Sequence, residues 1–409
     1  MKILYLKTAG FDNSAIGGSI THTLGMINGF VDSGADVTVL TSDEINLIRA
    51  KQEIIKIKSF RKIPYLYNYI YAKRMKKGIQ KWLKNDTSTY DFLYYRYALF
   101  FDAGLLIEKK KEISSVLEFN SFQTDSFRDM FIETAKKTQG KLMNFFITVF
   151  SKFVIRLIKK YEDKVITNTS KFITVSEVNK NELINRYGIK TENIQVIPNG
   201  VDTDIFKNDQ TSADEIRREL NIPHERIVAG FAGTFGNWHG IPELTDAVLQ
   251  TANRKNLFFL IMGSGPMLRY MQERLSGLTN IYFTGVVPYG RMSAYLSACD
   301  ILILSNSWNP PSGKSFFGSP TKLFEYMAMG KAIAATKLGQ TVDILEHEKN
   351  ALLCESGDES GLTAAILRYA DDSELRALTG ATAREDVIKK HTWKSNAVKV
   401  VIFMTGSVL

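Results

Sequence analysis

Short apolar runs alternate with longer segments of helical periodicity along nearly the whole chain. Short runs that are apolar throughout predict strands buried on both faces of a sheet. In the first half of the chain such runs lie at 2–7, 36–42, 92–97, 115–120, 172–176 and 195–197. In the second half they lie at 227–232, 257–262, 281–286, 301–305 and 332–336, with a weaker one at 351–354.

Helical patterns separate most of these predicted strands, for example at 19–33, 178–187, 242–251, 266–275, 291–298 and 362–371. Strand–helix alternation predicts parallel sheets covered on both faces. It occurs twice, with a break near 198–202. We therefore expect an α/β protein with two Rossmann-like, doubly wound parallel-sheet domains facing each other across a cleft. We expect the ligand between them, at the carboxyl ends of the strands. The expected units are 1–205, 206–390, and a last helix at 391–409 that packs back on the first domain.

Composition adds little to this picture. The chain has 409 residues, 44% hydrophobic and 23% charged, as in ordinary soluble globular proteins. Its two cysteines, Cys299 and Cys354, form no disulfide framework or metal cluster, so we expect a cytoplasmic protein. No apolar run reads as a signal peptide or a membrane-spanning helix.

Positive charge is concentrated in two segments. The net charge is +9, and 60–84 alone carries eight Lys or Arg and no acid. The segment 141–164 is a second basic, apolar stretch. Either segment could be a solvated helix with its apolar face on the core. Either could instead be a peripheral surface for anionic lipids or a lipid-linked substrate, at the inner face of the membrane. No nucleic-acid module is present in the sequence, so nucleic acid is not an expected partner.

The richest candidate site lies at 305–336, where a strand, a Gly/Pro/Ser-rich loop, a helix and a second strand follow one another. Ser319 suits the N-cap of that helix and Pro320 its first position. Such junctions bind phosphate because free N–H groups and the helix dipole point at the anion. Lys322 in the first turn opposes the dipole, which indicates a ligand rather than stability. Glu325 follows on the same face and suits ribose hydroxyls.

The segment 231–240 (FAGTFGNWHG) also joins a strand to a helix. Its glycines let the backbone approach a ligand closely, and Trp238 and His239 could contact phosphate or sugar. The alternative is a tight turn with a packed Trp.

Two further glycine turns follow strands. Gly17 and Gly18 precede His22 but do not form the dinucleotide fingerprint GxGxxG, which disfavours a dehydrogenase. His22 is either a structural or a catalytic residue. The turn at 263–265 is at the sheet edge where a ligand would lie. The DxD sequence at 202–204 is expected to be a turn and not a metal site.

Together these motifs resemble the retaining glycosyltransferases of family 4, which have the GT-B fold. The resemblance covers nearly the whole chain and rests on GGSITH, VLEFN, ITVSEVNKNEL, PNGVD, FAGTFGNWHG, GSG and SPTKLFEYMAMGKAIAAT. The combination of WHG with SPxKLFEYMA is similar to a branch that builds bacterial surface polysaccharides and glycans.

The resemblance implies roles for individual residues. Lys322 would neutralise the donor diphosphate, and Glu325 would bind the nucleotide ribose. Gly17 and Gly18 would lie against the phosphates. The remaining residues expected to contact the donor are Ser319, Pro320, Thr321, Gly233, Thr234 and Gly263. His22 and His239 join Lys322 and Glu325 as candidate catalytic residues.

Two departures from the family pattern stand out. The first carboxylate of the family's Glu-x7-Glu pair is Phe317 here. Where many members carry Arg and Lys to hold the diphosphate, this chain has Thr234 and His239. His239 would partly replace that charge.

The function implied is transfer of a sugar from a UDP- or GDP-sugar to a hydroxyl of a glycan or lipid-linked acceptor. The resemblance implies retention at the anomeric carbon, no metal or other cofactor, and a leaving phosphate that takes the acceptor's proton. The alternatives are a sugar-nucleotide epimerase of the same fold, or a non-catalytic nucleotide-sugar-binding subunit of a polysaccharide assembly.

Overall fold

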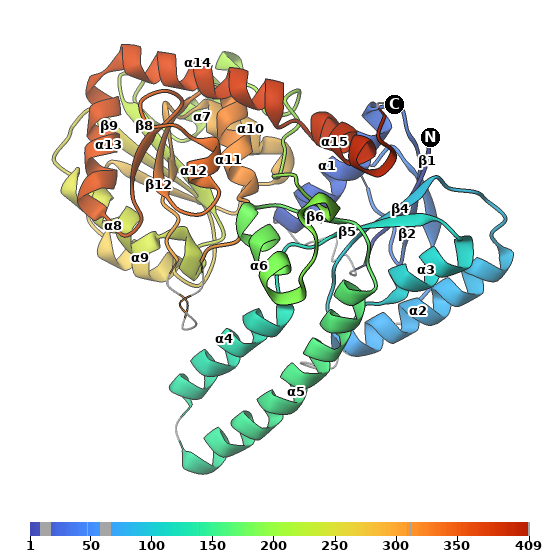
Figure 1. Cartoon of the computed structure of the whole chain (residues 1–409). Coiled ribbons are helices and arrows are strands. Elements are labelled where there is room, and N and C mark those ends of the chain that lie inside the picture. The colour runs from blue at the N-terminus through green and yellow to red at the C-terminus, as the bar shows by residue number, and fades with distance from the viewer. Residues whose placement is uncertain are drawn as a thin grey trace.

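In the computed structural model the chain folds into two α/β domains (Figure 1). The described residues are 1–8, 18–46, 48–57, 67–138, 140–308, 310, 313 and 315–407. Gly17 and residues 60–66, on which two of the expectations rest, lie outside this part of the chain.

The first domain is built on a seven-stranded sheet in the order β3-β2-β1-β4-β5-β6-β7, with every neighbouring pair parallel. The strands are β1 (Lys2–Leu6), β2 (Asp36–Thr41), β3 (Lys51–Ile54), β4 (Phe92–Arg96), β5 (Ser114–Glu118), β6 (Phe172–Thr174) and β7 (Ile194–Val196). The six predicted strands are present. The seventh, β3, is a half-exposed edge strand with the sequence KQEI, so it has no apolar run to predict it.

The second domain is built on a six-stranded parallel sheet in the order β10-β9-β8-β11-β12-β13. Its strands are β8 (Ile227–Gly233), β9 (Leu257–Gly263), β10 (Ile281–Gly285), β11 (Ile301–Leu304), β12 (Ala332–Lys337) and β13 (Leu352–Glu355). All six were predicted. The sheet is buried on both faces, as the continuous apolar runs of β9 and β11 require.

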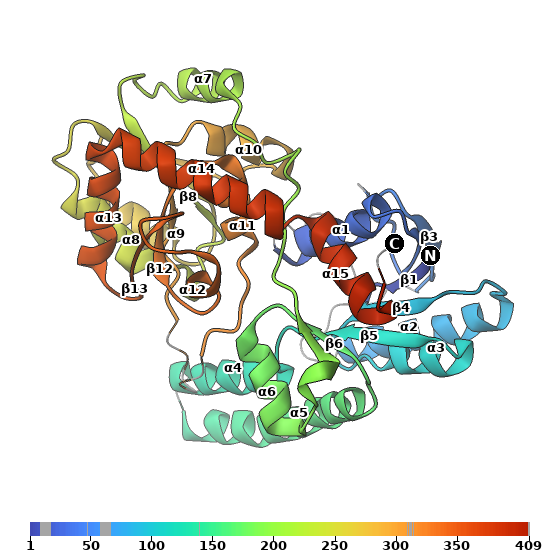
Figure 2. The ribbon, with the colours of Figure 1, turned by 45° about the horizontal axis from the view of Figure 1, so that its top comes forward.

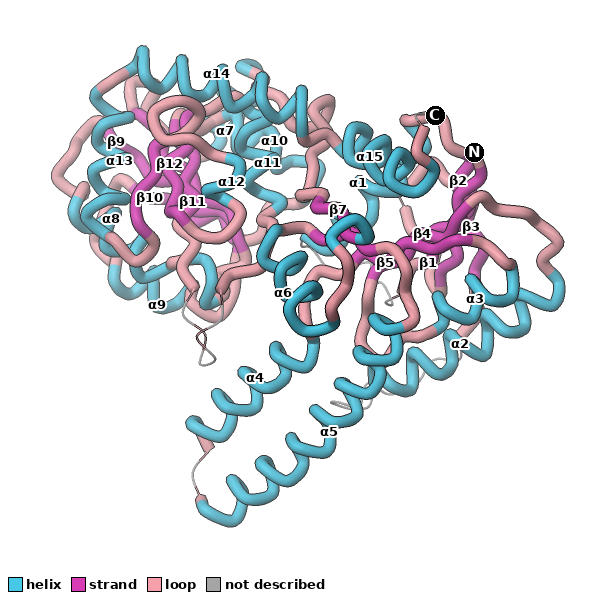
Figure 3. Tube along the Cα trace, in the orientation of Figure 1, coloured by secondary structure: helices cyan, strands magenta, loops and turns pink. Residues whose placement is uncertain are grey.

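Helices cover both faces of each sheet, as Figure 3 shows. In the first domain they are α1 (Gly18–Asp32), α2 (Tyr67–Asn85), α3 (Ala103–Lys111), α4 (Gln123–Lys137), α5 (Lys141–Thr167) and α6 (Glu177–Tyr187). In the second they are α7 (Gln210–Glu219), α8 (Ile241–Gln250), α9 (Leu268–Arg274), α10 (Tyr289–Ser297), α11 (Thr321–Met329), α12 (Thr341–Ile344), α13 (Glu359–Asp371) and α14 (Ser373–Lys390). Two single 3₁₀ turns lie at Thr191–Asn193 and Asn237–His239. The expected doubly wound α/β architecture is therefore confirmed.

The last helix, α15 (Trp393–Thr405), leaves the second domain and packs against α1 of the first (Figure 2). Two glycines of α1 make this contact possible. A Cβ atom on Gly25 would lie 2.2 Å from the Trp393 ring, and one on Gly29 would lie 2.4 Å from the Trp393 carbonyl oxygen. Any side chain at either position would separate the two helices.

The helices α4 and α5 form an antiparallel hairpin that projects from the first domain (Figures 1 and 2). α5 has 27 residues and its first turn contains no acidic residue. Within the described residues, no helix has both the length and the apolar character needed to cross a membrane.

Candidate functional site

A cavity of about 1080 Å³ lies between the two domains. The residues that line it follow the carboxyl ends of strands in both sheets. The strand order reverses between β1 and β4 in one sheet and between β8 and β11 in the other. In open α/β sheets ligands bind at such reversal points. The fold therefore turns the two ligand-binding edges toward one shared cavity.

The helix α11 begins at the cavity, one residue later than predicted. Pro320 takes the N-cap position with an extended backbone (ψ 116°), and Thr321 is the first helical residue. Ser319 is therefore not the cap, because its hydroxyl oxygen instead accepts a hydrogen bond from the backbone N–H of Asn199, at 2.9 Å. No described side chain caps the helix. The free N–H groups of its first turn remain available for an anion.

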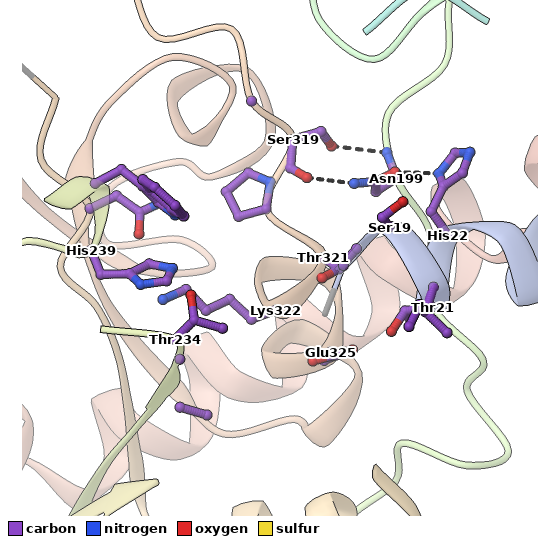
Figure 4. Close-up of a pocket in the computed structure, with 18 of the residues that line it drawn as sticks. Ser19, Thr21, His22, Asn199, Thr234, His239, Ser319, Thr321, Lys322 and Glu325 are labelled. Carbon is purple, nitrogen blue, oxygen red and sulfur yellow. Dashed lines mark hydrogen bonds between the residues drawn. The ribbon is translucent and has the colours of Figure 1, made fainter. Parts of the chain in front are cut away.

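Lys322, the second residue of α11, has a buried side chain that lines the cavity (Figure 4). It is 9% exposed, and its Nζ atom has no hydrogen-bond partner among the described residues. The Nζ atom lies 4.5 Å from the centre of the Phe231 ring. Burial lowers the pKa of Lys322 to about 7, against a partial opposing effect of Glu325. A buried ammonium without a partner is unfavourable unless a ligand supplies one.

Glu325 lies one helical turn beyond Lys322 and also lines the cavity. Burial raises the pKa of its carboxyl group to about 7, while the charge of Lys322 lowers it in part. The next residue, Tyr326, points into the core, where its hydroxyl oxygen accepts a hydrogen bond from the Ala232 N–H at 2.8 Å. The helix therefore presents a cation and a carboxylate to the cavity and an aromatic ring to the sheet.

Close contacts between backbone segments explain why certain positions in the loops of the second domain are occupied by glycine. A Cβ atom on Gly240 would lie 1.6 Å from the Ser305 carbonyl oxygen, and one on Gly263 would lie 1.9 Å from that of Gly233. Both glycines have positive φ, 58° and 119°. The loops after β8, β9 and β11 thus stack backbone on backbone. Gly233, Gly263 and the exposed Thr234 also line the cavity, so the tight turns and the candidate site coincide.

His239 is neutral in this environment. Burial, followed by the charge of Lys322, lowers the pKa of His239 to about 2. Its Nδ1 atom accepts a hydrogen bond from the Gly236 N–H at 3.3 Å, which leaves the proton on Nε2. The ring lies beside Lys322 at the cavity (Figure 4). His239 can donate a hydrogen bond but carries no charge, so it does not replace the missing cations of the family pattern. Trp238 is 45% exposed at the cavity rim, so the alternative of a packed Trp is wrong.

The first domain's wall of the cavity is a hydrogen-bonded network around His22. The Nε2 atom of His22 lies 2.7 Å from Glu118 Oε2, and its Nδ1 atom lies 2.7 Å from Asn199 Oδ1. Both partners are acceptors, because Asn199 uses its amide nitrogen to donate to the Ser319 carbonyl oxygen (Figure 4). Each ring nitrogen of His22 therefore faces an acceptor, and the ring is held from both sides.

Glu118 is the centre of this network. It is fully buried, and it accepts further hydrogen bonds from Tyr94 and Asn120, with Arg96 Nε 3.4 Å away. Burial by itself raises the pKa of Glu118, but the charge of His22 and the surrounding donors outweigh it and bring the pKa down to about 2. The charges on this wall already have their partners within the protein.

The two walls meet at the starts of α1 and α11. A Cβ atom on Gly18 would lie 3.1 Å from Thr321 Oγ1, which is a close contact between the domains. Gly17 lies outside the described residues, so its expected position against a phosphate stays a prediction.

The residues of the site that were not predicted include Arg96, Glu118 and Asn199. A signal for Glu118 existed, because a carboxylate that ends an apolar run (VLEF) needs partners if the run is buried. Asn199 lies in PNGVD, which was interpreted as a break between domains and as one motif of the resemblance, but no role was predicted for the residue itself.

The smaller predictions were also tested. Asp202 accepts hydrogen bonds from the backbone N–H groups of Asp204, at 3.0 Å, and of Ile205, at 3.2 Å, so 202–204 is a turn as predicted. Among the described residues no group of three His, Cys, Asp or Glu side chains could hold a metal ion. Cys299 and Cys354 are buried, free thiols.

Family models match both halves of the chain. The model described as Glycosyltransferase Family 4 matches residues 16–205, and the model described as Glycosyl transferases group 1 matches residues 226–372. The two halves of the chain are thus similar to the two domains of family 4 glycosyltransferases, and the architecture is the GT-B fold. The narrower resemblance, to a WHG/SPxKLFEYMA branch, stays a prediction.

Individual relatives are distant. The uncharacterised glycosyltransferase MJ1607 of Methanocaldococcus jannaschii is 23% identical over 245 residues, which cover 57% of this chain and 61% of the relative. A 2-deoxystreptamine glucosyltransferase of Streptomyces kanamyceticus is 27% identical over 214 residues, which cover 50% of this chain and 53% of the relative. The chain thus spans roughly half to three-fifths of the length of the curated relatives it matches.

The fold is shared with solved structures over its full length. Anabaena Alr3699/HepE, crystallised in complex with UDP, has a TM-score of 0.68 to this chain at 17% identity, with 100% of both chains covered. At this identity the likeness concerns the fold.

Proposed function

We propose that this protein transfers a sugar from a nucleoside diphosphate sugar, linked to UDP or GDP, to a hydroxyl group of a glycan or lipid-linked acceptor, with retention at the anomeric carbon. The observation that carries the proposal is the buried side chain of Lys322 in the first turn of α11 at the interdomain cavity: among the described residues, its Nζ atom has no hydrogen-bond partner and no side chain caps the helix. A diphosphate would supply the missing partner. The UDP bound to the HepE structure, and the glucosyltransferase activity in the name of a relative, support the same chemistry.

The chemical role of Lys322 would be electrostatic. When the bond between the sugar's anomeric carbon and the diphosphate breaks, negative charge develops on the leaving oxygen. Lys322 and the free N–H groups of α11 would stabilise that charge. Removal of one such preorganised donor typically costs about 3 kcal/mol of transition-state stabilisation.

The acceptor would enter between the two walls. Its hydroxyl oxygen would bond to the anomeric carbon, and its proton would pass to the leaving phosphate, so that no separate protein base is required. Glu325 would accept hydrogen bonds from the ribose hydroxyls. His239 would donate a neutral hydrogen bond, from Nε2, to a phosphate or sugar oxygen. Movement of the domains toward each other would exclude water and limit hydrolysis of the donor.

A thermal-shift panel tests the proposal. The wild type and Lys322→Met would be heated with UDP, GDP, ADP and NAD, with Lys255→Met as a control for loss of an exposed lysine in the same domain. A ligand at 100 times its Kd stabilises the folded state by about 2.7 kcal/mol. We expect one nucleoside diphosphate to stabilise the wild type and the control but not Lys322→Met. If none of the four shifts the wild type, the proposed donor class is wrong.

A further inference from the structure

The α4–α5 hairpin carries an unusual concentration of exposed apolar side chains. α5 is about 40 Å long at 1.5 Å per residue, and much of its first half faces solvent. The large apolar side chains exposed along that half, with their exposed fractions, are Met143 57%, Phe145 63%, Val149 51%, Phe150 45% and Phe153 65%. Monomeric soluble proteins rarely expose contiguous apolar surface of this kind without a partner for it.

Three of these residues form a continuous line. Phe145, Val149 and Phe153 are spaced four residues apart and therefore lie on one face of α5; we call them the outer stripe. The opposite face carries Val154 and Ile158, which are buried against the first domain. The stripe therefore points away from the protein core.

Basic residues surround the stripe. Residues 141–160 contain five Lys or Arg and no Asp or Glu. Lys152 and Arg156 are exposed, and at seven and eleven residues beyond Phe145 they fall on the same side of the helix as the stripe. Apolar side chains flanked by cations on one exposed helix face are the pattern of helices that lie in a membrane interface.

We propose that the outer stripe of α5 docks on an anionic phospholipid bilayer, with Phe145, Val149 and Phe153 inserted below the headgroups and Lys152 and Arg156 paired with lipid phosphates. A second copy of the chain is a poorer occupant of this surface, since its stripe would bring like charges together. The occupant must combine an apolar interior with a negatively charged rim, and a bilayer with anionic lipids does so.

The other basic segment does not share this surface. α2 carries a similar density of Lys and Arg, but its apolar residues Tyr71, Met75 and Ile79 are buried in the core. The described part of 60–84 therefore has the apolar face on the core that the solvated-helix interpretation expects. Only α5, among these two helices, combines exposed cations with exposed apolar side chains.

The base of the hairpin lies at the cavity. Asn120 and Ser121, between β5 and α4, line the cavity, and α4 begins two residues later. A docked hairpin would hold the first-domain side of the cleft close to the lipid headgroups. Delivery of a lipid-linked acceptor from the bilayer to the cavity rests on the proposed function, whereas docking itself does not.

Vesicle flotation of the full chain tests the docking. Vesicles of phosphatidylcholine alone would be compared with vesicles of phosphatidylcholine and phosphatidylglycerol in equal amounts. We expect the wild type to float with the mixed vesicles and to be released by high salt. Phe145→Ser/Val149→Ser/Phe153→Ser should lower partitioning by at least about tenfold. Lys152→Gln/Arg156→Gln should lower it by about 30-fold, at about 1 kcal/mol for each cation.

Matched control variants come from the second domain. Val342→Ser/Leu378→Ser/Ile388→Ser removes three similarly exposed apolar side chains far from the hairpin, and it should float like the wild type. The melting temperature and the nucleotide-induced thermal shift of every variant report whether the fold and the donor site are intact, so failure of docking is separable from failure of the proposed transfer. Docking is refuted if the wild type does not float with mixed vesicles, or if the stripe variant floats as well as the wild type. A wild-type dimer that the stripe variant abolishes, with no flotation, would assign the stripe to a second copy instead.

Discussion

The two walls of the cleft use buried charge in opposite ways. On the first-domain wall, the Glu118 carboxylate has a full set of donors, and each ring nitrogen of His22 has an acceptor. On the second-domain wall, the Nζ atom of Lys322 has no hydrogen-bond partner among the described residues, and burial pulls its pKa far from the ordinary value. Both walls bury charge, which is costly in each case.

The difference teaches where a ligand is needed. A buried charge whose partners are all within the protein stabilises the fold, because those partners already offset the cost of removing the charge from water. A buried charge without partners lowers stability in the free protein and gains its partner on binding. We therefore expect substitutions on the first wall to change mainly stability, and substitutions on the second wall to change mainly binding and turnover.

The largest effect is expected for Lys322→Met. We expect the transfer rate to fall by about 100- to 1,000-fold, because a donor aimed at the developing charge is lost. The free energy of unfolding should not decrease, since the variant removes a buried charge that has no partner. Initial rates and urea unfolding measure the two quantities. Wild-type turnover would show that Lys322 has no part in the mechanism. A clear loss of stability would show that Lys322, like Glu118, serves mainly to stabilise the fold.

Glu118→Gln should show the reverse pattern. The variant leaves His22 and Arg96 without their shared counter-charge, so we expect the free energy of unfolding to fall by about 3 kcal/mol. Because the pKa of Glu118 is lowered from 4.5 to about 2, its stabilisation is complete above pH 4.5 and is lost as the pH falls toward 2. Urea unfolding at neutral and acid pH should show that the variant has lost this acid-dependent part. Equal midpoints for both proteins at both pH values would contradict the contrast between the walls.

A smaller effect is expected for Glu325→Gln. A hydrogen bond to a carboxylate is stronger than one to an amide, so the Kd of the nucleoside diphosphate should rise about tenfold. The informative control is the same nucleotide without a ribose hydroxyl. The deoxy nucleotide should bind the wild type more weakly than the ribonucleotide, and the variant should show a smaller difference between the two, as a coupled pair requires. Additive effects would mean that Glu325 does not touch the ribose.

The smallest effect is a pH dependence of binding. In the free protein Lys322 loses its proton as the pH rises through about 7, whereas the bound diphosphate would keep it protonated. Affinity is therefore full below pH 7 and should fall about fivefold between pH 7 and pH 8. Isothermal titration calorimetry at several pH values measures it. Lys322→Arg, which stays charged, should bind without this pH dependence; the same slope in that variant would point to another titrating group.

The strands that could be predicted from the sequence are those with a run of apolar residues. Strands such as β9 (LFFLIMG) are apolar throughout because both faces of a parallel sheet are covered, and these were predicted. The edge strand β3 was missed because it is held by backbone hydrogen bonds to β2 and not by burial of its side chains. Pairing of this kind leaves little trace in the pattern of apolar residues.

In the site, residues placed by local sequence spacing were predicted, whereas residues placed by contacts between distant parts of the chain were missed. Lys322 and Glu325 were predicted because their spacing on one helix fixes their common face. Glu118 and Asn199 were missed because they meet His22 from 96 and 177 residues away in the sequence. Ser319 was assigned as an N-cap by a local rule, but Asn199, 120 residues earlier, binds its hydroxyl instead.

The crossing of α15 onto α1 also has a consequence for how the protein is made. The chain builds the seven strands of the first sheet, then the complete second domain, and only afterwards the helix that fills the surface beside Gly25 and Gly29. During synthesis the first domain must therefore wait, with part of its apolar surface open, until its neighbour has been translated. The second domain, from α7 to α14, is translated before that helix, so it can complete its packing before the first domain does.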